Sequence, residues 1–568
     1  MRQRPLLTLA VLAALLCSAG ISHELWTPDE PRVAEIGRAM WASGDWAMPR
    51  LGGEPFLEKP PLYWWVQSGV FALAGRTDAA LARVPSALCA FLTALLTYAL
   101  GRRYFDRVAA LLGALVLLTM SEFAITSHWI VVDNALVTAV TAAFACFAHA
   151  RGRRGGPRAL CLAGMYVALA AAFLSKGVIG LAIPALGMAA HLLWTRSLRE
   201  FAGWHLVAGG LFVLGVAGAW LFALWLDGGD DALRTFLVYN QLGRFLPGAF
   251  EYEGGHTRPI WYYVVNAPAH WMPWTPFLAL ALVSARRCWN GFDARAREGI
   301  QLCLSASVPA VLALSLAGTK RGMYLDPICP PLALLVGAWM VWPAQRSRWE
   351  NRIEHGWWLA LVSLCAASFA TIVVALVLVS LSPVSIPPIV VTRGFWPWSA
   401  LGVSLLAAFA WLWRRAPPST RVDRHVASTV LVVLTALQLF LTIPSFVDRY
   451  KSFVPFVEAL REYVPADRPV YAYRPDETLL GVVGFYTHRI VTPIEMKALE
   501  ELAESSETQW VVVRDRRQKG GNYAAIQRAE IPHRLVSEQV VGNRRTLRIL
   551  ALGAMNTASE RAPGGNPQ

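Results

Sequence analysis

Long blocks of apolar residues, separated by short polar turns, dominate the pattern along most of the 568-residue chain. A membrane-spanning helix needs about 20 mostly apolar residues. The chain offers thirteen candidate blocks, at 6–22, 80–100, 108–126, 133–150, 158–174, 176–194, 203–225, 268–284, 299–316, 325–343, 356–380, 397–413 and 426–443. The pattern therefore predicts a polytopic α-helical membrane protein with about thirteen transmembrane helices.

The pattern changes after about Pro444. Residues 453–464 have helical spacing, 468–473 and 509–515 alternate as strands do, and 535–552 has the pattern of a hairpin around Gly542-Asn543. These segments predict a small α/β domain that follows the helical part in the sequence. We therefore expect three parts: a transmembrane domain (1–445, with outer loops 23–79 and 227–266), an α/β domain (446–555) and a disordered tail (556–568).

Basic residues collect in alternate turns and set the expected orientation. Six short turns, at 101–107, 151–158, 195–200, 285–297, 345–352 and 414–424, carry twenty Lys and Arg residues. Two short turns on the other side, at 127–132 and 381–396, carry only Arg393. Positively charged loops face the cytoplasm, so the N-terminus is expected there. An odd number of spans then places the C-terminal domain on the outer side of the membrane.

Composition excludes several classes of protein. Hydrophobic residues make up 55% of the chain and charged residues 16%, against about 25% charged in soluble domains. The net charge of +14 is explained by the basic turns, so no nucleic-acid partner is expected. The eight cysteines form no CxxC pair, which argues against a disulfide framework or cysteine metal site. Residues 1–25 have features of a signal peptide, but an uncleaved first span is favoured.

The first outer loop carries two adjacent carboxylates, Asp29 and Glu30, directly after the first span. Such a pair can act as a general base, or bind a divalent cation or a sugar amine. The structural alternative is helix capping, with Asp29 as N-cap before Pro31 and a helix over 31–42. The residues alone favour capping.

A lysine lies further along the same loop, in the sequence Glu58-Lys59-Pro60-Pro61. Lys59 is held in rigid backbone near the level of the lipid headgroups. It either extends its ammonium to the interface or grips a lipid phosphate, and the residues do not separate these two roles.

Further ionisable residues lie near the outer ends of other spans, where charge is costly and usually functional. Asp133 opens the fourth span and Lys176 the sixth, while Lys320, Arg321, Tyr324 and Asp326 share one outer turn. Arg244, His256 and Arg258 lie in the second large loop. The predicted topology brings all of them to one membrane face, as a cationic collar with an acidic counterpart.

The loop TPDEPRVAEIGRAMWASGDWAMPRLGGEPFLEKPPLYWW (27–65) closely resembles the first periplasmic loop of ArnT-like enzymes. These are aminoarabinose transferases of the protein-mannosyltransferase superfamily, integral membrane glycosyltransferases of the GT-C class. Further matches follow in order: 133–136, FLSKGVIGLAIP (173–184), HTRPIWYY (256–263), PWTPF (273–277) and KRGMYLDPICPPLALLVG (320–337). The resemblance covers about residues 1–445.

The resemblance implies roles for particular residues. Asp29 becomes the leading catalytic carboxylate, with Glu30 and Asp133 beside it. Lys59, Lys176 and Tyr324 would bind the carrier phosphate, and Arg244, Arg258 and Lys320 would assist them. Glu58 and His256 stand where a divalent cation could bind, although two ligands are thin support for a metal. Asp326 departs from the family pattern.

The resemblance also implies a function: transfer of a sugar from a polyprenyl phosphate to lipid A, another glycan or a protein, on the periplasmic face. The sugar that the resemblance implies is 4-amino-4-deoxy-L-arabinose, and displacement with inversion is expected. Membrane lipids are the remaining partners. Two alternatives are a transporter or lipid flippase, for which no repeated halves are evident, and a membrane anchor for a sensor or assembly domain in the tail.

Overall fold

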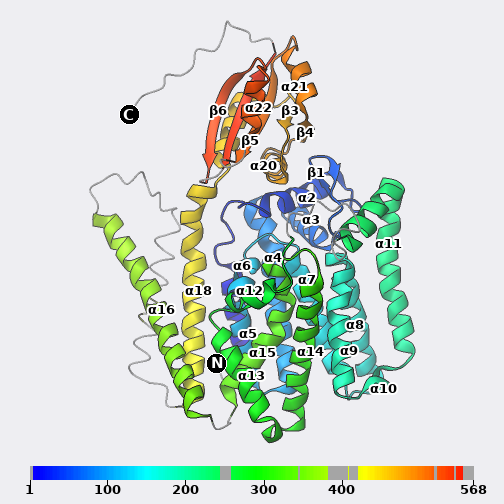
Figure 1. The fold of residues 1–568 in the computed structure, drawn as a ribbon, viewed down its shortest axis with the longest axis vertical. Coiled ribbons are helices and arrows are strands. Elements are labelled where there is room, and N and C mark those ends of the chain that lie inside the picture. Colours follow the sequence, from blue (N-terminus) through cyan, green and yellow to red (C-terminus); the bar gives the residue numbers. More distant parts are fainter. Residues whose placement is uncertain are drawn as a thin grey trace. The chain divides into compact units, whose positions relative to one another are not determined.

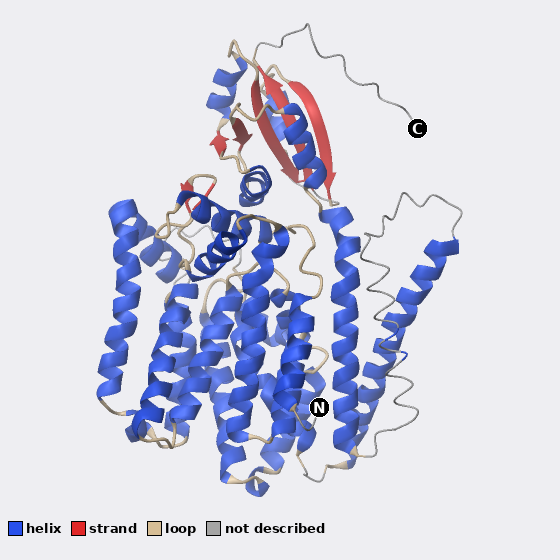
Figure 2. Ribbon diagram, turned by 180° about the vertical axis from the view of Figure 1, so that it is seen from behind, coloured by secondary structure: helices blue, strands red, loops and turns tan. Residues whose placement is uncertain are grey.

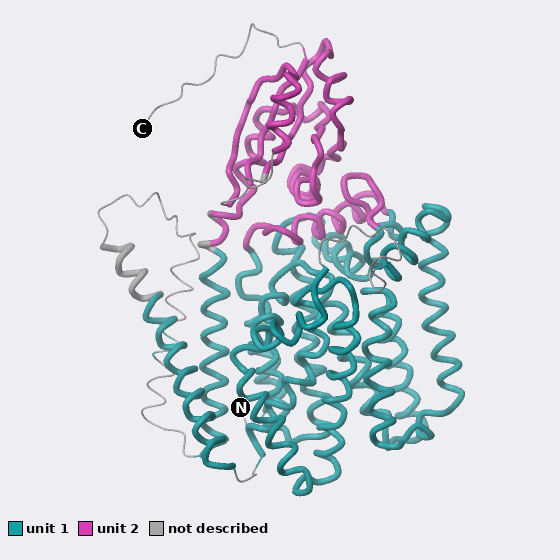
Figure 3. Tube along the Cα trace, in the orientation of Figure 1, with its two compact units in different colours: residues 1–22, 45–48, 57–445 teal, residues 23–44, 49–56, 446–568 magenta. Residues whose placement is uncertain are grey.

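A computed structural model describes residues 4–243, 257–342, 346–381, 404, 407, 420–516, 521–542 and 545–553. The chain forms two compact units (Figure 3). Unit 1 comprises residues 1–22, 45–48 and 57–445, and unit 2 comprises residues 23–44, 49–56 and 446–568. The first outer loop is thus divided between the two units.

Unit 1 is helical throughout its described part (Figure 1). Its first helices are α1 (Pro5–Ser18), α3 (Leu62–Ala74), α4 (Ala79–Tyr104), α5 (Arg107–Leu118), α6 (Ser121–Ser127), α7 (Asp133–Ala150), α8 (Gly155–Lys176) and α9 (Val178–Trp194). Then come α10 (Leu198–Phe201), α11 (Trp204–Arg234), the π-helix η1 (Thr235–Leu242), α12 (Tyr262–His270), α13 (Thr275–Arg287) and the short η2 (Trp289–Gly291). The last are α14 (Ala294–Leu316), the 3-10 helix η3 (Gly322–Ile328), α15 (Cys329–Val341), α16 (Arg348–Leu381) and α18 (Arg421–Lys451), which continues into unit 2.

Seven helices of the described chain are long and apolar enough to cross a membrane, or eight if the bent pair of α5 and α6 forms one span. This confirms a protein with many helical spans. Several expected spans are shorter helices: α1 has 14 residues, α9 has 17 and α13 has 13. The candidate at 397–413 lies outside the described residues, apart from isolated positions. The total of thirteen stays a prediction.

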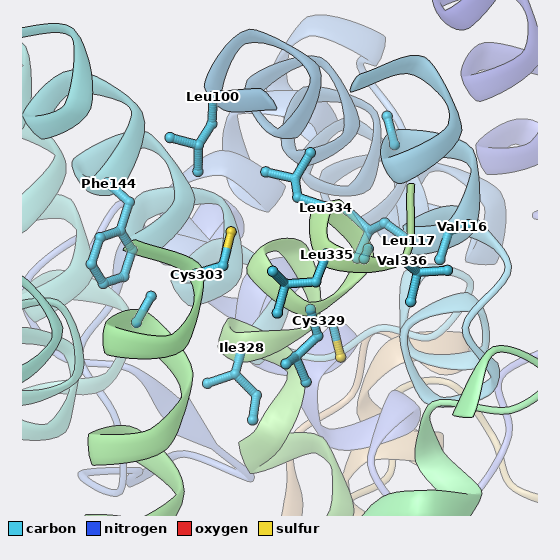
Figure 4. Packing of buried hydrophobic residues seen from close by; sticks show 14 of the residues in the cluster. Leu100, Val116, Leu117, Phe144, Cys303, Ile328, Cys329, Leu334, Leu335 and Val336 are labelled. Carbon is cyan, nitrogen blue, oxygen red and sulfur yellow. The ribbon is translucent and has the colours of Figure 1, made fainter. Parts of the chain in front are cut away.

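The core of unit 1 is built around α5 and α15. All ten residues of α5 from Ala109 to Leu118 are buried. Gly113 and Gly337 let the two backbones meet, because a Cβ at Gly337 would lie 2.4 Å from the backbone nitrogen of Gly113. Figure 4 shows Leu334, Leu335 and Val336 of α15 packed with residues of α5 and their neighbours. Helices buried on all sides read as unbroken apolar runs, which is why the sequence locates these spans well.

Unit 2 contains a five-stranded sheet, of order β4-β3-β5-β7-β6 (Figure 2). The strands are β3 (Val470–Tyr473), β4 (Val491–Ile494), β5 (Gln509–Arg516), β6 (Arg534–Val541) and β7 (Arg545–Leu552). β3 pairs in parallel with β4 and β5, whereas β7 is antiparallel to β5 and β6. The expected β6–β7 hairpin is present, and the two predicted strands at 468–473 and 509–515 correspond to β3 and β5.

Helices cover both faces of this sheet, because side chains along a strand alternate between faces. Trp510 and Val512 pack with α19 (Val454–Tyr463) and α20 (Glu477–Thr487). Val511 and Val513 face α21 (Met496–Ala503) and α22 (Asn522–Arg528) on the other side. This is the expected α/β arrangement. The predicted tail at 556–568 lies outside the described residues.

Unit 2 also takes in the beginning of the first outer loop. Helix α2 (Glu30–Ser43) packs against α20, and the short strands β1 (Arg50–Leu51) and β2 (Glu54–Pro55) form a two-residue hairpin ladder beside them (Figure 1). The sequence grouped this loop with the transmembrane domain. The boundaries predicted for the domains stay a prediction.

Candidate active site

In unit 1, a buried carboxylate is held between two lysines from different segments. Asp133 is the first residue of α7 and its side chain is 2% exposed. Lys176, the last residue of α8, donates to Asp133 Oδ1. The Lys59 Nζ lies 3.9 Å from Asp133 Oδ2. The sequence placed these three residues on one membrane face, and the structure brings them together.

Tyr324 joins this cluster from η3. The Lys176 Nζ lies 3.8 Å from the centroid of the Tyr324 ring, a cation–π contact. Lys176 therefore touches both an acidic and an aromatic partner. The group of Asp133, Lys59, Lys176 and Tyr324 is called the lysine cluster below.

The lysine cluster opens onto a cavity with an apolar side. Its polar lining consists of Glu58, Lys59, Lys176, Asn240, Gln241, Thr319 and Tyr324. Its apolar lining consists of Leu136, Ile179, Ile183, Leu314 and Ala317. Cationic groups beside an aliphatic wall suit an amphipathic anion such as a phosphate on a hydrocarbon chain, because the phosphate meets donors and the chain stays out of water.

Gln241 is a lining residue that the sequence analysis missed. Its Oε1 accepts a hydrogen bond of 3.0 Å from the Val178 backbone at the start of α9. The same oxygen lies 2.1 Å from the position of a Cβ at Gly177, whose φ is +67°. Gly177 thus turns the chain between Lys176 and α9, and Gln241 fills the space that its missing side chain leaves. Only the polar pair Asn240-Gln241 at the end of an apolar run could have signalled this.

Lys320 and Arg258 lie together, but neither is among the residues that line the cavity. The Lys320 Nζ donates to the backbone carbonyl of Arg258 at 3.0 Å and to that of Ala317. Burial lowers the pKa of Lys320 below that of a free lysine. The Arg258 side chain is exposed. Lys320 therefore fastens the chain before η3, and its binding of a phosphate stays a prediction.

Arg244 and His256 lie outside the described residues, so their predicted roles rest on the sequence alone. Glu58 lines the cavity next to Lys59. Within the described ranges, no group of three His, Cys, Asp or Glu side chains is close enough to hold a metal. Of the two expected ligands, Glu58 alone is described, so binding of a divalent cation stays a prediction.

Asp29 and Glu30 are buried in unit 2, with 6% and 2% exposure. The Glu30 Oε2 accepts a hydrogen bond of 2.7 Å from the Trp26 backbone. The Asp29 Oδ1 lies 2.5 Å from the Arg32 guanidinium, which also pairs with Glu477 of α20. Two carboxylates therefore share one arginine. These contacts are all internal to unit 2.

The sequence correctly predicted that a helix begins directly after Asp29, but the prediction that the Asp29 side chain caps this helix is wrong. The helix begins at Glu30, with Asp29 at the N-cap position. Asp29 has α-helical dihedral angles, however, and its side chain makes no capping hydrogen bond. Its carboxylate turns to Arg32 instead. An N-cap side chain accepts from the second or third helical amide, so this carboxylate has a different task.

Asp326, which departs from the family pattern, is fully buried in η3. The Thr126 hydroxyl of α6 lies 2.9 Å from its Oδ2, while Oδ1 has no hydrogen-bond partner among the described residues. Asp326 lies two residues from Tyr324 and links η3 to α6. It is not among the cavity-lining residues.

Comparisons with known proteins agree with this picture. The family of dolichyl-phosphate-mannose-protein mannosyltransferases matches residues 5–226. Similar relatives are undecaprenyl phosphate-alpha-4-amino-4-deoxy-L-arabinose arabinosyl transferases. The Pseudomonas aeruginosa LESB58 enzyme is 31% identical over 58% of this chain and 58% of its own length. The Proteus mirabilis enzyme is 29% identical over 69% and 70%, and the Pseudomonas fluorescens enzyme 30% identical over 56% and 53%.

The aligned region thus spans between about half and 70% of these relatives. Among solved structures, ArnT from Cupriavidus metallidurans bound to undecaprenyl phosphate has a TM-score of 0.73 at 19% identity, over 98% of each chain. At this low sequence identity, the structural similarity shows a shared fold and nothing about activity. The chain is therefore similar in sequence to the arabinosyl transferases over part of their length, and it shares the fold of the solved ArnT structure over nearly all of its own.

Proposed function

We propose that this protein is a glycosyltransferase that takes a sugar from a polyprenyl phosphate, undecaprenyl phosphate by analogy with its relatives. The observation that carries the proposal is the lysine cluster at an apolar-sided cavity. Two lysines there pair with Asp133, and an arriving phosphate can replace part of that pairing. The names of the relatives support this donor class.

The chemistry follows from the leaving group. When the bond between the sugar and the carrier phosphate breaks, negative charge develops on the phosphate oxygen, and fixed cations lower the barrier by stabilising it. Lys59 and Lys176 serve this purpose in the proposal. Asp29 or Asp133 orients or deprotonates the incoming nucleophile. A phosphate acceptor needs little base catalysis, so positioning then dominates.

The finer parts of the proposal rest on resemblance. The sugar is 4-amino-4-deoxy-L-arabinose, the acceptor is lipid A, and displacement proceeds with inversion. The site faces the periplasm of a thirteen-span inner-membrane protein with its N-terminus in the cytoplasm. The uneven distribution of basic turns supports this orientation.

A direct assay tests the proposal. Purified protein in lipid nanodiscs is incubated with undecaprenyl phosphate carrying the aminosugar and with lipid A, and products are resolved by mass spectrometry. The expected product is lipid A heavier by one aminoarabinose. Movement of the donor across a vesicle bilayer without any new glycoside would instead favour the flippase alternative.

A separate measurement tests orientation. Reporter fusions after residues 155 and 560 should give opposite activity profiles, because the first point is expected in the cytoplasm and the second in the periplasm. Matching profiles would contradict an active site on the outer face.

A further inference from the structure

We infer that helix α20 of the C-terminal α/β domain positions Asp29 for catalysis, with Glu477, Gly481 and Gly484 as the residues that set its place. The inference rests on the proposed function of Asp29. It assigns a task to a domain for which neither the sequence nor the relatives' names suggest one.

The first observation is the closeness of α20 to α2. A Cβ at Gly481 would lie 2.5 Å from the Arg32 backbone nitrogen and 2.6 Å from the Pro31 carbonyl oxygen. A Cβ at Gly484 would lie 2.4 Å from the Glu35 carboxyl group. Real Cβ atoms do not approach that closely. A side chain at Gly481 would push the two backbones apart, and one at Gly484 would displace the Glu35 carboxyl group. Glycine at both positions lets α20 lie directly against the first turns of α2.

The second observation is an ionic chain from α20 to Asp29. Glu477, in the first turn of α20, pairs with Arg32, and Arg32 lies 2.5 Å from Asp29. Arg32 is 12% exposed, and the Glu477 side chain is 47% exposed. A planar guanidinium pairs with carboxylates in a fixed geometry, so the Glu477–Arg32 contact restricts where Arg32 can hold Asp29.

The third observation is that other contacts to this loop come from the same C-terminal part of unit 2. The backbone of Leu25 donates to the Tyr486 hydroxyl at 3.1 Å, and Trp26 Nε1 donates to Asp448 at 2.7 Å. Arg545 of β7 donates to the Thr27 hydroxyl. Three residues just before Asp29, like Arg32 just after it, are therefore tied to segments that follow Asp29 by more than 400 positions. A site held from an ordered domain is more exact than one on a loop.

An ion pair at the contact between α20 and α2 also supports a role of α20 in positioning Asp29. Glu35 forms a bidentate pair with Arg38 at 2.6 and 2.8 Å, and burial raises the pKa of Glu35. Gly484 lies against this carboxyl group, so α20 contacts α2 through a fixed ion pair as well as through backbone. Asp29 lies directly before α2, less than two helical turns from Glu35.

The test uses the full-length protein in nanodiscs and three variants. Glu477→Gln keeps the size but removes the charge, Glu477→Asp restores the charge, and Gly484→Ala adds a methyl group at the contact. The matched control is Glu495→Gln, which breaks the exposed Arg474–Glu495 pair elsewhere in the same domain. Transfer kinetics and hydrogen exchange of backbone amides are measured on each.

The expected result has two parts. In Glu477→Gln, kcat falls about three- to ten-fold, because small misplacements of a reacting group are costly, while KM for the donor stays unchanged. Glu477→Asp recovers part of the loss, and the control matches wild type. In Gly484→Ala, exchange rises in residues 30–43 and kcat falls by about ten-fold or more, while strands β3 and β5 stay protected.

Other results overturn the inference. Wild-type kcat in both Glu477→Gln and Gly484→Ala would show that the contact is only structural, even if exchange rises. If Gly484→Ala unfolds the domain, Glu477→Gln decides alone, because exposed ion pairs contribute little to folding. If wild-type protein shows no transfer at all, the proposed function fails. Exchange confined to 30–43 in Gly484→Ala would then still show that α20 holds α2.

Discussion

Two buried carboxylates that the sequence singled out, one in each unit, lie in opposite electrostatic settings. In unit 1, Asp133 lies between Lys59 and Lys176, so two cations share one carboxylate. In unit 2, Asp29 and Glu477 share Arg32, so two carboxylates share one cation. The first arrangement suits binding of an anion such as a phosphate. The second gathers carboxylates around one arginine, and a carboxylate can orient a nucleophile or a sugar amine.

Removal of the Asp29 charge is the largest expected effect. Asp29→Asn keeps the shape and a hydrogen-bond acceptor for Arg32 but removes negative charge and basicity. We expect transfer to fall by about a hundred-fold or more, since a positioned base contributes about 10²–10⁴-fold. Thermal stability should fall much less, because Arg32 keeps its pair with Glu477. Steady-state kinetics and thermal melts check this. A wild-type rate would move the leading role to Asp133, and Asp29→Ala is the companion control.

The second-largest effect is expected from loss of either lysine of the lysine cluster, which should lower the catalytic efficiency with the lipid-linked sugar donor. A charge-assisted contact to phosphate contributes about 1.5–3 kcal/mol, so kcat/KM is expected to fall about ten- to a hundred-fold in Lys59→Ala and Lys176→Ala. Lys176→Ala should be the more severe, because Lys176 also contacts Tyr324. The exposed Lys497→Ala is the control. Near-normal transfer by both variants would return these lysines to an interfacial anchoring role.

A methyl group at Gly177 tests whether Gln241 helps to shape the cavity. Gly177→Ala introduces strain at a positive φ and collides with Gln241. Lys176 is the adjacent residue, so kcat/KM should fall about ten-fold, the scale on which reacting groups lose rate when displaced. Gly69→Ala, with open space around it, is the control. Equal kinetics in the two variants would exclude a role for this turn.

The smallest effect concerns pH and the α20 end of unit 2. Burial lowers the pKa of His488, and the nearby Arg38 and Arg461 lower it further. The unfolded chain therefore binds the proton at higher pH than the folded one, and stability falls as pH drops below about 6.5. His488→Asn tolerates the positive φ at this position and should flatten that dependence in thermal melts between pH 5 and 7. An unchanged slope would remove His488 as its source.

The sequence analysis identified both carboxylates and the two lysines around Asp133, but it missed Arg32 and Glu477, the partners around Asp29. Asp133 and Lys176 stand at the ends of α7 and α8, where a long apolar run meets polar residues, so periodicity alone located them. Gln241 gave almost no signal, because its task depends on Gly177, which reaches it only through folding. Asp29 was correctly placed at a helix start, yet its capping role was wrong because Arg32 attracts its carboxylate.

The sequence by itself determined what local pattern can encode. Runs of apolar residues specify helices in a membrane, period-two alternation specifies the strands of the tail, and charged residues at run ends mark candidate chemistry. Tertiary structure decided what depends on distant segments. It divided the first outer loop between two units, set α20 against α2 through Gly481 and Gly484, and gave Arg32 to both Asp29 and Glu477. Such contacts join positions hundreds of residues apart, and no local pattern carries that information.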